Sequence, residues 1–371
     1  MGAPWFRMQD FVKQHGIVGL SSNYALYADM SNRVMSILQD FSPNQEVYSI
    51  DECFLDLTGI NFVNLVDYGQ TMRKRILDWT GLPVCVGIAS SKTLAKLANH
   101  CAKKKPEFNG VCNLNALTDE ALTALLAGLP VGEVWGVGRK LSPKLNAIGI
   151  HTAFDLKNSA PHKIRQQFSV VMQKTVMELN GTVCIEFEEI APPKKQILSS
   201  RSFGHSVADY KSLEEAITLY MTRAAEKLRK QDSCAGSVFV YIRTSPFKPD
   251  EPQYSNGLMI PMQIPTDDTR QLVKVALWGL KRIYRTGFRY AKAGVMLGEL
   301  IPTNQVQPDF FAKNFEISSN KLMGVLDHIN QKMGRGSIKL ASEGFKQPWR
   351  MKQGNKSPNY TTQWSDVPNV L

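Results

Sequence analysis

Asp51 and Glu52 are adjacent carboxylates within the run EVYSIDECFLDLTG, residues 46–59, whose apolar flanks are typical of strands. Neighbours on a straight strand point to opposite faces, but at a hairpin turn or bulge the two side chains can converge. Converging carboxylates repel each other unless cations hold them. A pair of Mg²⁺ ions, which prefer oxygen ligands, would do so and would catalyse phosphoryl transfer. The alternative is a solvated turn without a catalytic role, and the dipeptide alone does not decide between the two.

A glycine-rich turn could supply a second kind of chemistry. In WGVGRK, Gly136 and Gly138 allow a tight backbone turn that leaves amides free, and Arg139 and Lys140 add positive charge. Free amides at a helix N-terminus suit a phosphate oxygen. With the following GIHTAFDL, the pattern predicts a helix-hairpin-helix that holds a nucleic-acid backbone without reading its sequence. An ordinary helical turn with a glycine cap is the alternative.

Two shorter stretches are open to two interpretations each. The helix end LANHCAKKK, residues 97–105, carries three lysines. They either complement the helix dipole or include a lysine that reaches a nucleoside triphosphate. In the irregular C-terminal part, QPDFF places Phe310 and Phe311 shortly after Gln307. Such a segment either docks into a partner's pocket or packs against the chain's own body.

Residues 201–300 are basic, with 15 Lys and Arg against 10 Asp and Glu. Arg201, Arg243, Arg289 and Lys292 fall in predicted strands. We expect exposed cations on one face of a sheet to follow a phosphate backbone. A solvated basic face is the alternative.

The hydrophobic pattern before residue 117 predicts alternating strands and helices, which favours an α/β layer with a sheet backed by helices. The predicted elements, in order, are a helix over residues 24–41, the strands EVYSI and CFLDL, a helix over 72–79, the strand PVCVGIA and the helix KTLAKLANHCAKK.

The remaining chain changes character several times, and we predict an α+β sheet domain near its middle. In that domain Ser212 and Glu215 match a capping box at the start of the helix SLEEAITLYMTRAAEKLRK. The predicted segments are an α/β domain over residues 1–116, a helical domain over 117–187, a linker over 188–198, the α+β domain over 199–302 and an irregular tail over 303–371.

Composition limits the function classes. A chain of 371 residues with 43% hydrophobic content can bury two or three cores. The net charge of +11 favours polyanionic partners, nucleic acid first and an acidic membrane surface second. The six cysteines include no CxxC pair, which argues against a zinc site. No secretion signal and no apolar run of membrane-spanning length is found, so we expect a cytoplasmic protein without disulfides.

Taken together, these blocks resemble the Y-family of lesion-bypassing DNA polymerases. YSIDECFLDLTG resembles the SIDE motif of that family, and VGIASSKTLAKLANHCAKK resembles the next block. WGVGRK resembles the thumb hairpin, and SSRSFG, residues 199–204, resembles the opening of the little-finger domain. SSNYALYADMSNRVMS, residues 21–36, and SPNYTTQWSDVP, residues 357–368, are typical of the UmuC branch. The resemblance covers the whole chain.

The resemblance implies a right-hand polymerase: palm and fingers, a helical thumb with a helix-hairpin-helix, an α+β little finger and an irregular tail. It implies error-prone synthesis on damaged primer–template DNA from incoming dNTPs during the SOS response, with Mg²⁺ as cofactor. The implied partners are the processed UmuD dimer, the RecA filament and the sliding clamp, and the implied location is the bacterial cytoplasm, at the nucleoid when on DNA.

The resemblance also implies a role for each candidate residue. The implied roles are catalysis and metal binding for Asp51 and Glu52, nucleotide binding for Lys103, DNA binding for Gly136, Gly138, Arg139, Lys140, Arg201 and Arg243, and clamp binding for Gln307, Phe310 and Phe311.

One departure from the family pattern concerns the first residues. In this family a strand with a further metal-binding Asp precedes the block that matches MGAPWF, where this sequence begins. We therefore expect the first palm strand and part of the fingers to be missing, and neither Asp29 nor Asp56 obviously replaces the ligand. On this expectation the chain alone has little or no polymerase activity. Two functions are then possible: a translesion polymerase subunit, or a non-catalytic remnant that binds DNA and partners.

Overall fold

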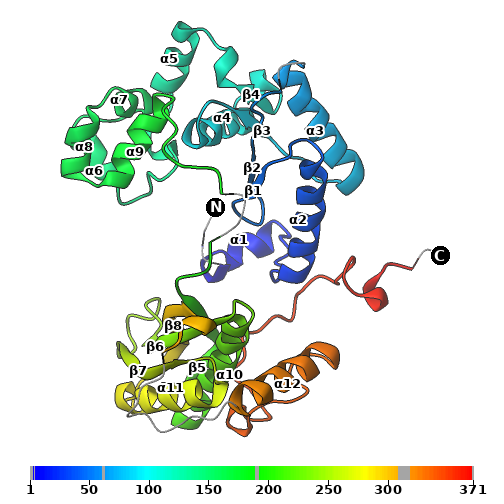
Figure 1. Ribbon diagram of the computed structural model, residues 1–371, viewed down its shortest axis with the longest axis vertical. Coiled ribbons are helices and arrows are strands. Elements are labelled where there is room, and N and C mark those ends of the chain that lie inside the picture. The colour runs from blue at the N-terminus through cyan, green and yellow to red at the C-terminus, as the bar shows by residue number, and fades with distance from the viewer. Residues whose placement is uncertain (1–2, 4, 61–62, 189–191, 308–317, 370–371) are drawn as a thin grey trace. The chain divides into compact units, whose positions relative to one another are not determined.

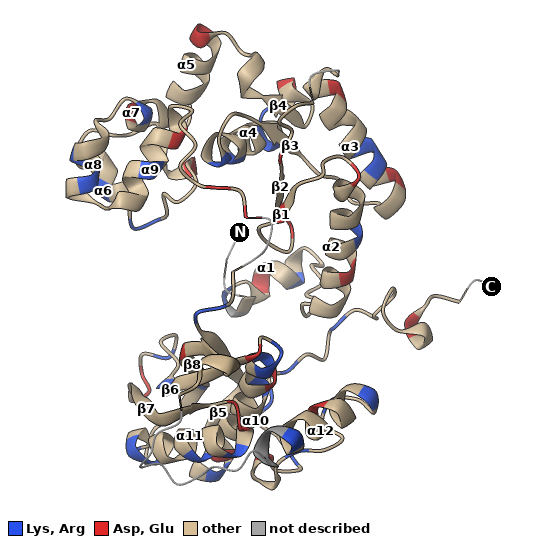
Figure 2. Cartoon of the chain, in the orientation of Figure 1, with Lys and Arg blue, Asp and Glu red and all other residues tan. Residues whose placement is uncertain are grey.

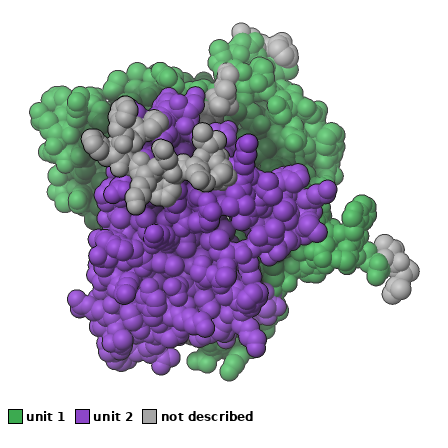
Figure 3. All heavy atoms as spheres, turned by 60° about the horizontal axis from the view of Figure 1, so that its bottom comes forward, with its two compact units in different colours: residues 1–191, 356–371 green, residues 192–355 purple. Residues whose placement is uncertain are grey.

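The computed structural model describes residues 3, 5–60, 63–188, 192–307 and 318–369. The chain folds into two compact units, coloured separately in Figure 3. Unit 1 comprises residues 1–191 and 356–371, and unit 2 comprises residues 192–355. Across the described part of the chain, every helix is too short or too polar to span a lipid bilayer.

Unit 1 is mainly helical, with short strands (Figure 1). Its elements, in chain order, are η1 (Trp5–Arg7), α1 (Gln9–Gln14), α2 (Tyr24–Gln39), β1 (Gln45–Val47), β2 (Cys53–Leu55), α3 (Leu65–Thr80), β3 (Val86–Ile88), α4 (Lys92–Lys104), η2 (Pro106–Phe108), β4 (Val111–Asn113), η3 (Leu114–Ala116), α5 (Asp119–Ala127), η4 (Val131–Glu133), α6 (Ser142–Asn146), α7 (Ala153–Lys157), α8 (Pro161–Gln167), α9 (Val170–Leu179) and, in the C-terminal segment, η7 (Trp364–Asp366).

The described strands of unit 1 form two separate two-stranded sheets. β1 and β2 pair antiparallel as a hairpin, with Val47 opposite Cys53. β3 and β4 pair in parallel, with Val86 opposite Val111, and α4 forms the crossover between them. The predicted strands and helices are therefore present, but their sheet is divided in two, because no described strand pairs with both the hairpin and the parallel pair.

One hydrophobic core joins α4 to the helices that follow it. Leu97 and Cys101 of α4 are buried in the same cluster as Leu126 of α5, Leu145 of α6 and Val176 of α9. Burying a side chain of this size stabilises a fold by about 1.5–3 kcal/mol. Since α4 shares this core with α5–α9, these later helices fix its position.

Unit 2 combines a four-stranded antiparallel sheet, in the order β5-β8-β6-β7, with helices of 15 to 20 residues. The sheet and its helices confirm the α+β arrangement predicted for this part of the chain. The elements, in chain order, are β5 (Ile197–Val207), α10 (Tyr210–Arg229), β6 (Ser233–Thr244), β7 (Ser255–Thr266), α11 (Thr269–Ile283), β8 (Tyr290–Pro302), η5 (Thr303–Gln305), α12 (Ser318–Lys332) and η6 (Ala341–Glu343).

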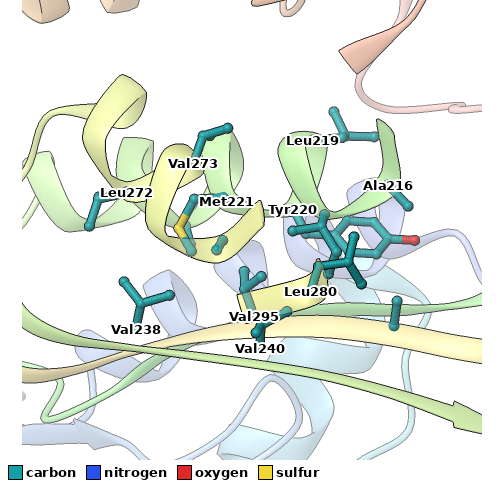
Figure 4. Packing of buried hydrophobic residues seen from close by; sticks show 14 of the residues in the cluster. Ala216, Leu219, Tyr220, Met221, Val238, Val240, Leu272, Val273, Leu280 and Val295 are labelled. Carbon is teal, nitrogen blue, oxygen red and sulfur yellow. The ribbon is translucent and has the colours of Figure 1, made fainter. Parts of the chain in front are cut away.

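The core of unit 2 lies between the sheet and one layer of helices, α10 and α11 (Figure 4). Val238 and Val240 of β6 point toward these helices, as does Val295 of β8, and Leu280 of α11 meets them. Phe239, between the two valines, is only partly buried. Alternation of this kind is expected when one face of a sheet is covered and the other is not.

Helix α10 begins one turn earlier than its sequence predicts. The N-cap is Asp209, whose carboxylate accepts a hydrogen bond from the Ser212 amide at 2.8 Å. The predicted capping box of Ser212 and Glu215 is therefore wrong, because Asp is as good an N-cap as Ser and lies at the true start. Glu215 has another role, since its carboxylate accepts a hydrogen bond from the Trp349 indole at 3.2 Å.

Residues after α12 are divided between the two units. In unit 2, Trp349 is 1% exposed and packs edge-on against Phe203 and Tyr220. In unit 1, the buried Asn23 caps α2 and donates hydrogen bonds to the carbonyls of Ser357 and Pro358 at 3.0 and 3.2 Å. The C-terminal segment is thus an integral part of both folds.

Candidate active site and nucleic-acid surfaces

Asp51 and Glu52 lie in the turn of the β1–β2 hairpin. The amides of Tyr48 and Ser49 both donate to the Glu52 carbonyl, at 3.1 and 3.0 Å, and these bonds close the turn. The sequence predicts a strand on either side of the two acids, and the structure confirms that the acids lie in the turn between these strands. The hairpin is short, because each of its strands has three residues.

The two carboxylates have different partners. Asp51 is exposed and accepts a hydrogen bond from the Ser49 hydroxyl at 2.5 Å. Glu52 forms an ion pair with the Lys96 ammonium at 2.5 Å, and the Lys96 side chain is 18% exposed. The lysine thereby offsets the negative charge of one of the two acids, which relieves the repulsion expected between neighbouring carboxylates.

Helix α4 supplies a second lysine to the same hairpin, and the sequence-based prediction missed both lysines. Lys92 is 9% exposed, pairs with Glu46 of β1 and donates to the Glu186 carbonyl at 2.6 Å. Lys92 and Lys96 are four residues apart and so lie on one helix face. The sequence holds a signal for them: cations near a helix N-terminus oppose the helix dipole and call for a local anionic partner.

Glu178 of α9 fixes the N-terminus of α4. Its fully buried carboxylate accepts hydrogen bonds from the amides of Thr93, Cys184 and Ile185 at 2.9, 2.8 and 3.1 Å. Its own carbonyl accepts from the Ser91 hydroxyl at 2.8 Å. Burial raises the pKa of this carboxyl, but the three amide bonds outweigh it and leave the pKa below its ordinary value. Glu178 is a positioning residue for the two lysines that follow Ser91.

An aromatic cluster connects the acidic hairpin to the glycine turn. The Trp135 indole donates to the Tyr48 hydroxyl at 3.3 Å, and Trp135 also packs against Phe54 of β2. The Lys96 ammonium lies 5.1 Å from the Tyr48 ring and 6.0 Å from the Trp135 ring. A cation over aromatic faces is attracted to them, so the cluster holds Lys96 against Glu52.

The glycine turn exposes the four residues predicted to hold DNA: Gly136, Gly138, Arg139 and Lys140. Gly136 has φ +89°, a conformation that other residues rarely adopt, so glycine is required there. η4 and α6 flank the turn, and the Gly138 carbonyl accepts the Ser142 amide at 3.0 Å to start α6. The geometry is that of a short helical hairpin.

Lys103 lies near the C-terminal end of α4 and is exposed. Seven residues of helix, about 10 Å of rise, separate it from Lys96. The structure therefore does not bring Lys103 to the acid pair in the way that it brings Lys92 and Lys96. Its nucleotide-binding role stays a prediction.

The two candidate arginines of unit 2 lie on opposite faces of the sheet. Arg243 pairs with Lys292 across β6 and β8, on the face away from the helices. Arg201 pairs with Ala293, which is buried under the helices, so Arg201 points to the helix side. The prediction that these cations share one sheet face is wrong for Arg201. Arg201 lies opposite Ala293 and not opposite Lys292, and neighbouring residues of a strand point to opposite faces. Arg289 precedes β8 and lies outside the strands.

The predicted clamp-binding peptide is only partly described. Gln307 is exposed at the end of the described stretch. Phe310 and Phe311 lie outside the described residues.

A pocket of about 600 Å³ adjoins the acids in unit 1. Asp51, Glu52 and Lys96 lie on its wall with apolar residues of both small sheets, Leu55 and Val86 among them. Two carboxylates are suitable ligands for a divalent ion. Mg²⁺ in particular takes oxygen ligands in an octahedral arrangement. Within the described residues, no group of three or more acidic, histidine or cysteine side chains could hold a metal. The acids therefore fit part of a metal site and do not complete one.

The two other acids weighed as metal ligands have local roles. Asp29 of α2 forms an ion pair with Arg33 at 2.8 Å. Asp56 accepts the Thr58 amide at 2.9 Å, and hydrogen bonds from Thr58 hold the pKa of the Asp56 carboxyl below its ordinary value.

Comparison with family models decides the relationship of the chain. Residues 1–100 match the impB/mucB/samB family, 119–150 the IMS family HHH motif and 194–310 the impB/mucB/samB family C-terminal domain. The chain belongs to the impB/mucB/samB family. Residues 320–370 match a domain of unknown function, DUF4113.

Individual relatives agree with the family assignment. The chain is 46% identical to Protein UmuC of Salmonella typhimurium, over all of this chain and 88% of that protein. It is 44% identical to Protein ImpB of Salmonella typhimurium, over 99% of this chain and 87% of that protein. The resemblance to the UmuC branch of the Y-family, predicted from the motifs, is confirmed.

A solved structure supports the fold. The Y-family DNA polymerase chimera Dbh-Dpo4(243-245)-Dbh is similar with a TM-score of 0.60 at 22% identity, over 81% of this chain and 83% of that one. At this identity the likeness concerns the fold, and it confirms the predicted right-hand polymerase architecture.

Proposed function

We propose that this family member carries out error-prone translesion synthesis, which is template-directed nucleotidyl transfer on damaged DNA. The observation that carries the proposal is the 46% identity to UmuC across the whole chain. The acid hairpin lies within the matched region, with lysines and the glycine turn around it. SOS-linked DNA repair and mutagenesis are the setting expected of this family.

The proposed roles at the acid hairpin follow from charge. Asp51 and Glu52 act as the catalytic carboxylates and contribute to a divalent-metal site, with Mg²⁺ as the ion. The metal, when bound, would stabilise charge on the transferring phosphoryl group. Lys96 keeps Glu52 paired when no other cation is present, and Glu178 and Trp135 keep Lys96 in place. Lys103 is proposed to contact the incoming dNTP.

Two groups of exposed cations and glycines suit a DNA backbone. Gly136, Gly138, Arg139 and Lys140 are proposed to hold the primer–template through phosphate contacts. Arg243, beside Lys292 on the open face of the unit 2 sheet, is proposed to contact the same duplex. Such contacts give affinity without sequence preference and weaken with salt.

Three protein partners follow from the relationship to UmuC as proposals. They are the processed UmuD dimer, the RecA filament and the sliding clamp, with Gln307, Phe310 and Phe311 as the clamp-binding residues. The proposed location is the bacterial cytoplasm, at the nucleoid when the protein is on DNA.

The test is single-nucleotide incorporation by the full chain on a primer–template with an abasic site, with Mg²⁺ present. The 46% identity to UmuC favours an active polymerase over a non-catalytic remnant, so we expect incorporation, which Asp51→Asn and Glu52→Gln should each reduce by a factor of about 100 or more. Asp78→Asn, on the exposed face of α3, is the matched control and should leave the rate unchanged. Incorporation that both hairpin variants leave unchanged would remove the proposed catalytic role.

DNA binding should be measured in the same samples by fluorescence anisotropy. Tight, salt-dependent binding without any incorporation would favour a DNA-binding subunit instead of a polymerase.

A further inference from the structure

Figure 2 marks Lys and Arg in blue, and five of these cations lie close together on the helix-covered side of unit 2, away from the open sheet face. This group has contributions from β5, α10 and the segment that matches the domain of unknown function. We call it the α10 cationic surface, and it consists of Arg201, Arg223, Lys227, Arg335 and Arg350.

Contacts within unit 2 bring these residues together. Arg223 and Lys227 are four residues apart on one face of α10. Arg335 reaches the same face, because its guanidinium lies 3.7 Å from the carboxylate of Glu226. Arg201 points to the helix side of β5, as its pairing with Ala293 requires.

The C-terminal segment adds Arg350 beside the edge strand β5. The Gly204 amide donates to the Trp349 carbonyl at 3.0 Å, which ties the backbone next to Arg350 to β5. A side chain at Gly204 would meet the Arg350 carbonyl oxygen at 2.3 Å, so glycine allows this close approach. The DUF4113 segment therefore helps to build the surface.

The positive charge of this surface is poorly neutralised within the described residues. Arg335–Glu226 is the one ion pair formed there by the five cations. The Arg223 Nε atom is buried and has no hydrogen-bond partner in the described part of the chain. Burial lowers the pKa of Arg223, and the charges of Arg201, Arg335 and Arg350 lower it further. The buried Glu343 is nearby, but it accepts the Thr222 hydroxyl and burial raises the pKa of its carboxyl.

We propose that the α10 cationic surface binds the phosphate backbone of a nucleic-acid strand, at a place separate from the open sheet face. Four of its five cations are arginines, whose planar forks match phosphate oxygens. A strand with regularly spaced phosphates neutralises several of these cations at once. This favours a nucleic-acid strand over an acidic peptide. This inference rests on the proposed function in one respect, because a protein that acts on DNA is brought close to nucleic-acid strands.

Arginine footprinting on the full chain tests the location. The protein is treated with a phenylglyoxal reagent with and without a single-stranded oligonucleotide, in the presence of saturating primer–template, and modification is read by mass spectrometry. We expect the oligonucleotide to protect Arg201, Arg335 and Arg350 and to leave Arg282 of α11 reactive. Protection of Arg243 alone would overturn the proposal, as would protection by a poly-glutamate peptide and not by DNA.

Equilibrium binding of the same oligonucleotide tests the contribution of the cations. Arg223→Gln with Arg350→Gln should weaken binding about tenfold and reduce the slope of log affinity against log salt by about 1.4. Lys274→Gln with Lys281→Gln removes the same charge from α11 and should change neither. Equal affinity and slope in both double variants would overturn the proposal.

The two proposals fail separately. If the footprint appears without nucleotide incorporation, the α10 cationic surface stands and the polymerase function does not. If incorporation proceeds without the footprint, the polymerase function stands and the α10 cationic surface does not bind nucleic acid.

Discussion

Unit 1 and unit 2 hold their charged side chains in place by different means. In unit 1 the acids lie on a hairpin whose strands have three residues each, and contacts from α4, α9 and the glycine turn fix them. In unit 2 the strands have 11 to 13 residues, and the register of a continuous sheet decides which face each cation reaches. A site built on short strands therefore depends on a few buried polar contacts, whereas a long sheet depends on its apolar core.

Lys92→Met breaks a buried polar contact and should have the largest effect. It leaves Glu46, 14% exposed, without its cation, and breaking a buried pair costs about 3–5 kcal/mol. Urea unfolding followed by tryptophan fluorescence measures the loss. Lys74→Met is the control, because its pair with Asp78 is exposed and such pairs contribute about 0–1 kcal/mol. Equal losses in the two variants would contradict the proposed dependence on buried contacts.

Leu280→Ala tests the apolar side of the comparison. Leu280 is fully buried between α11 and the sheet, so truncation should cost about 2–5 kcal/mol of unfolding free energy (Figure 4). Leu322→Ala on α12 is the control, since Leu322 is 47% exposed. Thermal unfolding with hydrogen exchange should localise the loss to unit 2. A loss of equal size in unit 1 would show that the two cores are not independent.

Glu178→Gln should cost less and should show a pH dependence. The glutamine side chain keeps one acceptor oxygen but points an NH₂ donor at backbone N–H groups. The free energy of unfolding at pH 7 should therefore fall by about 1–3 kcal/mol. The folded pKa of Glu178 lies below its ordinary value, so its carboxylate stabilises the fold at pH values above the ordinary pKa. That advantage disappears as the pH falls through the folded pKa. Unfolding of both proteins between pH 7 and acid measures the difference, which should narrow toward acid; a constant difference would exclude a titrating role.

Asn23→Ala should have the smallest effect on global stability. It removes the α2 N-cap and the donors to Ser357 and Pro358, and loss of a cap costs about 1 kcal/mol. Limited proteolysis should then cut the segment after Lys356 faster than in the unchanged protein. Asn32→Ala, in an exposed part of the same helix, is the control. Equal cleavage rates would mean that other contacts hold the segment.

Local patterns predicted much of the fold. Helical periodicity predicted α2 and α4, the strand-like runs predicted the acid hairpin, and the change of pattern after residue 196 predicted the α+β sheet of unit 2. These features depend on neighbours within a few residues, so the sequence contains them directly. The helix-hairpin-helix was predictable for the same reason, because glycine at position 136 is needed for a positive φ.

Contacts between distant segments were not predictable in this way. Glu178 lies 85 residues from Thr93, and Trp349 lies 134 residues from Glu215. Neither contact leaves a local pattern, because each depends on which core brings the segments together. The start of α10 at Asp209 shows the same limit on a smaller scale, since Asp209 and Ser212 are both good N-cap types and the local sequence did not decide between them.

The sequence by itself determined the chemistry available to this protein: two adjacent acids, a glycine turn with cations, and a basic second half. Tertiary structure decided which charges meet. It paired Glu52 with Lys96 through the position of α4, and it separated Arg201 from Arg243 through the strand register. The physical reason is that residue type sets what a side chain can bind, whereas long-range burial and register set what lies within its reach.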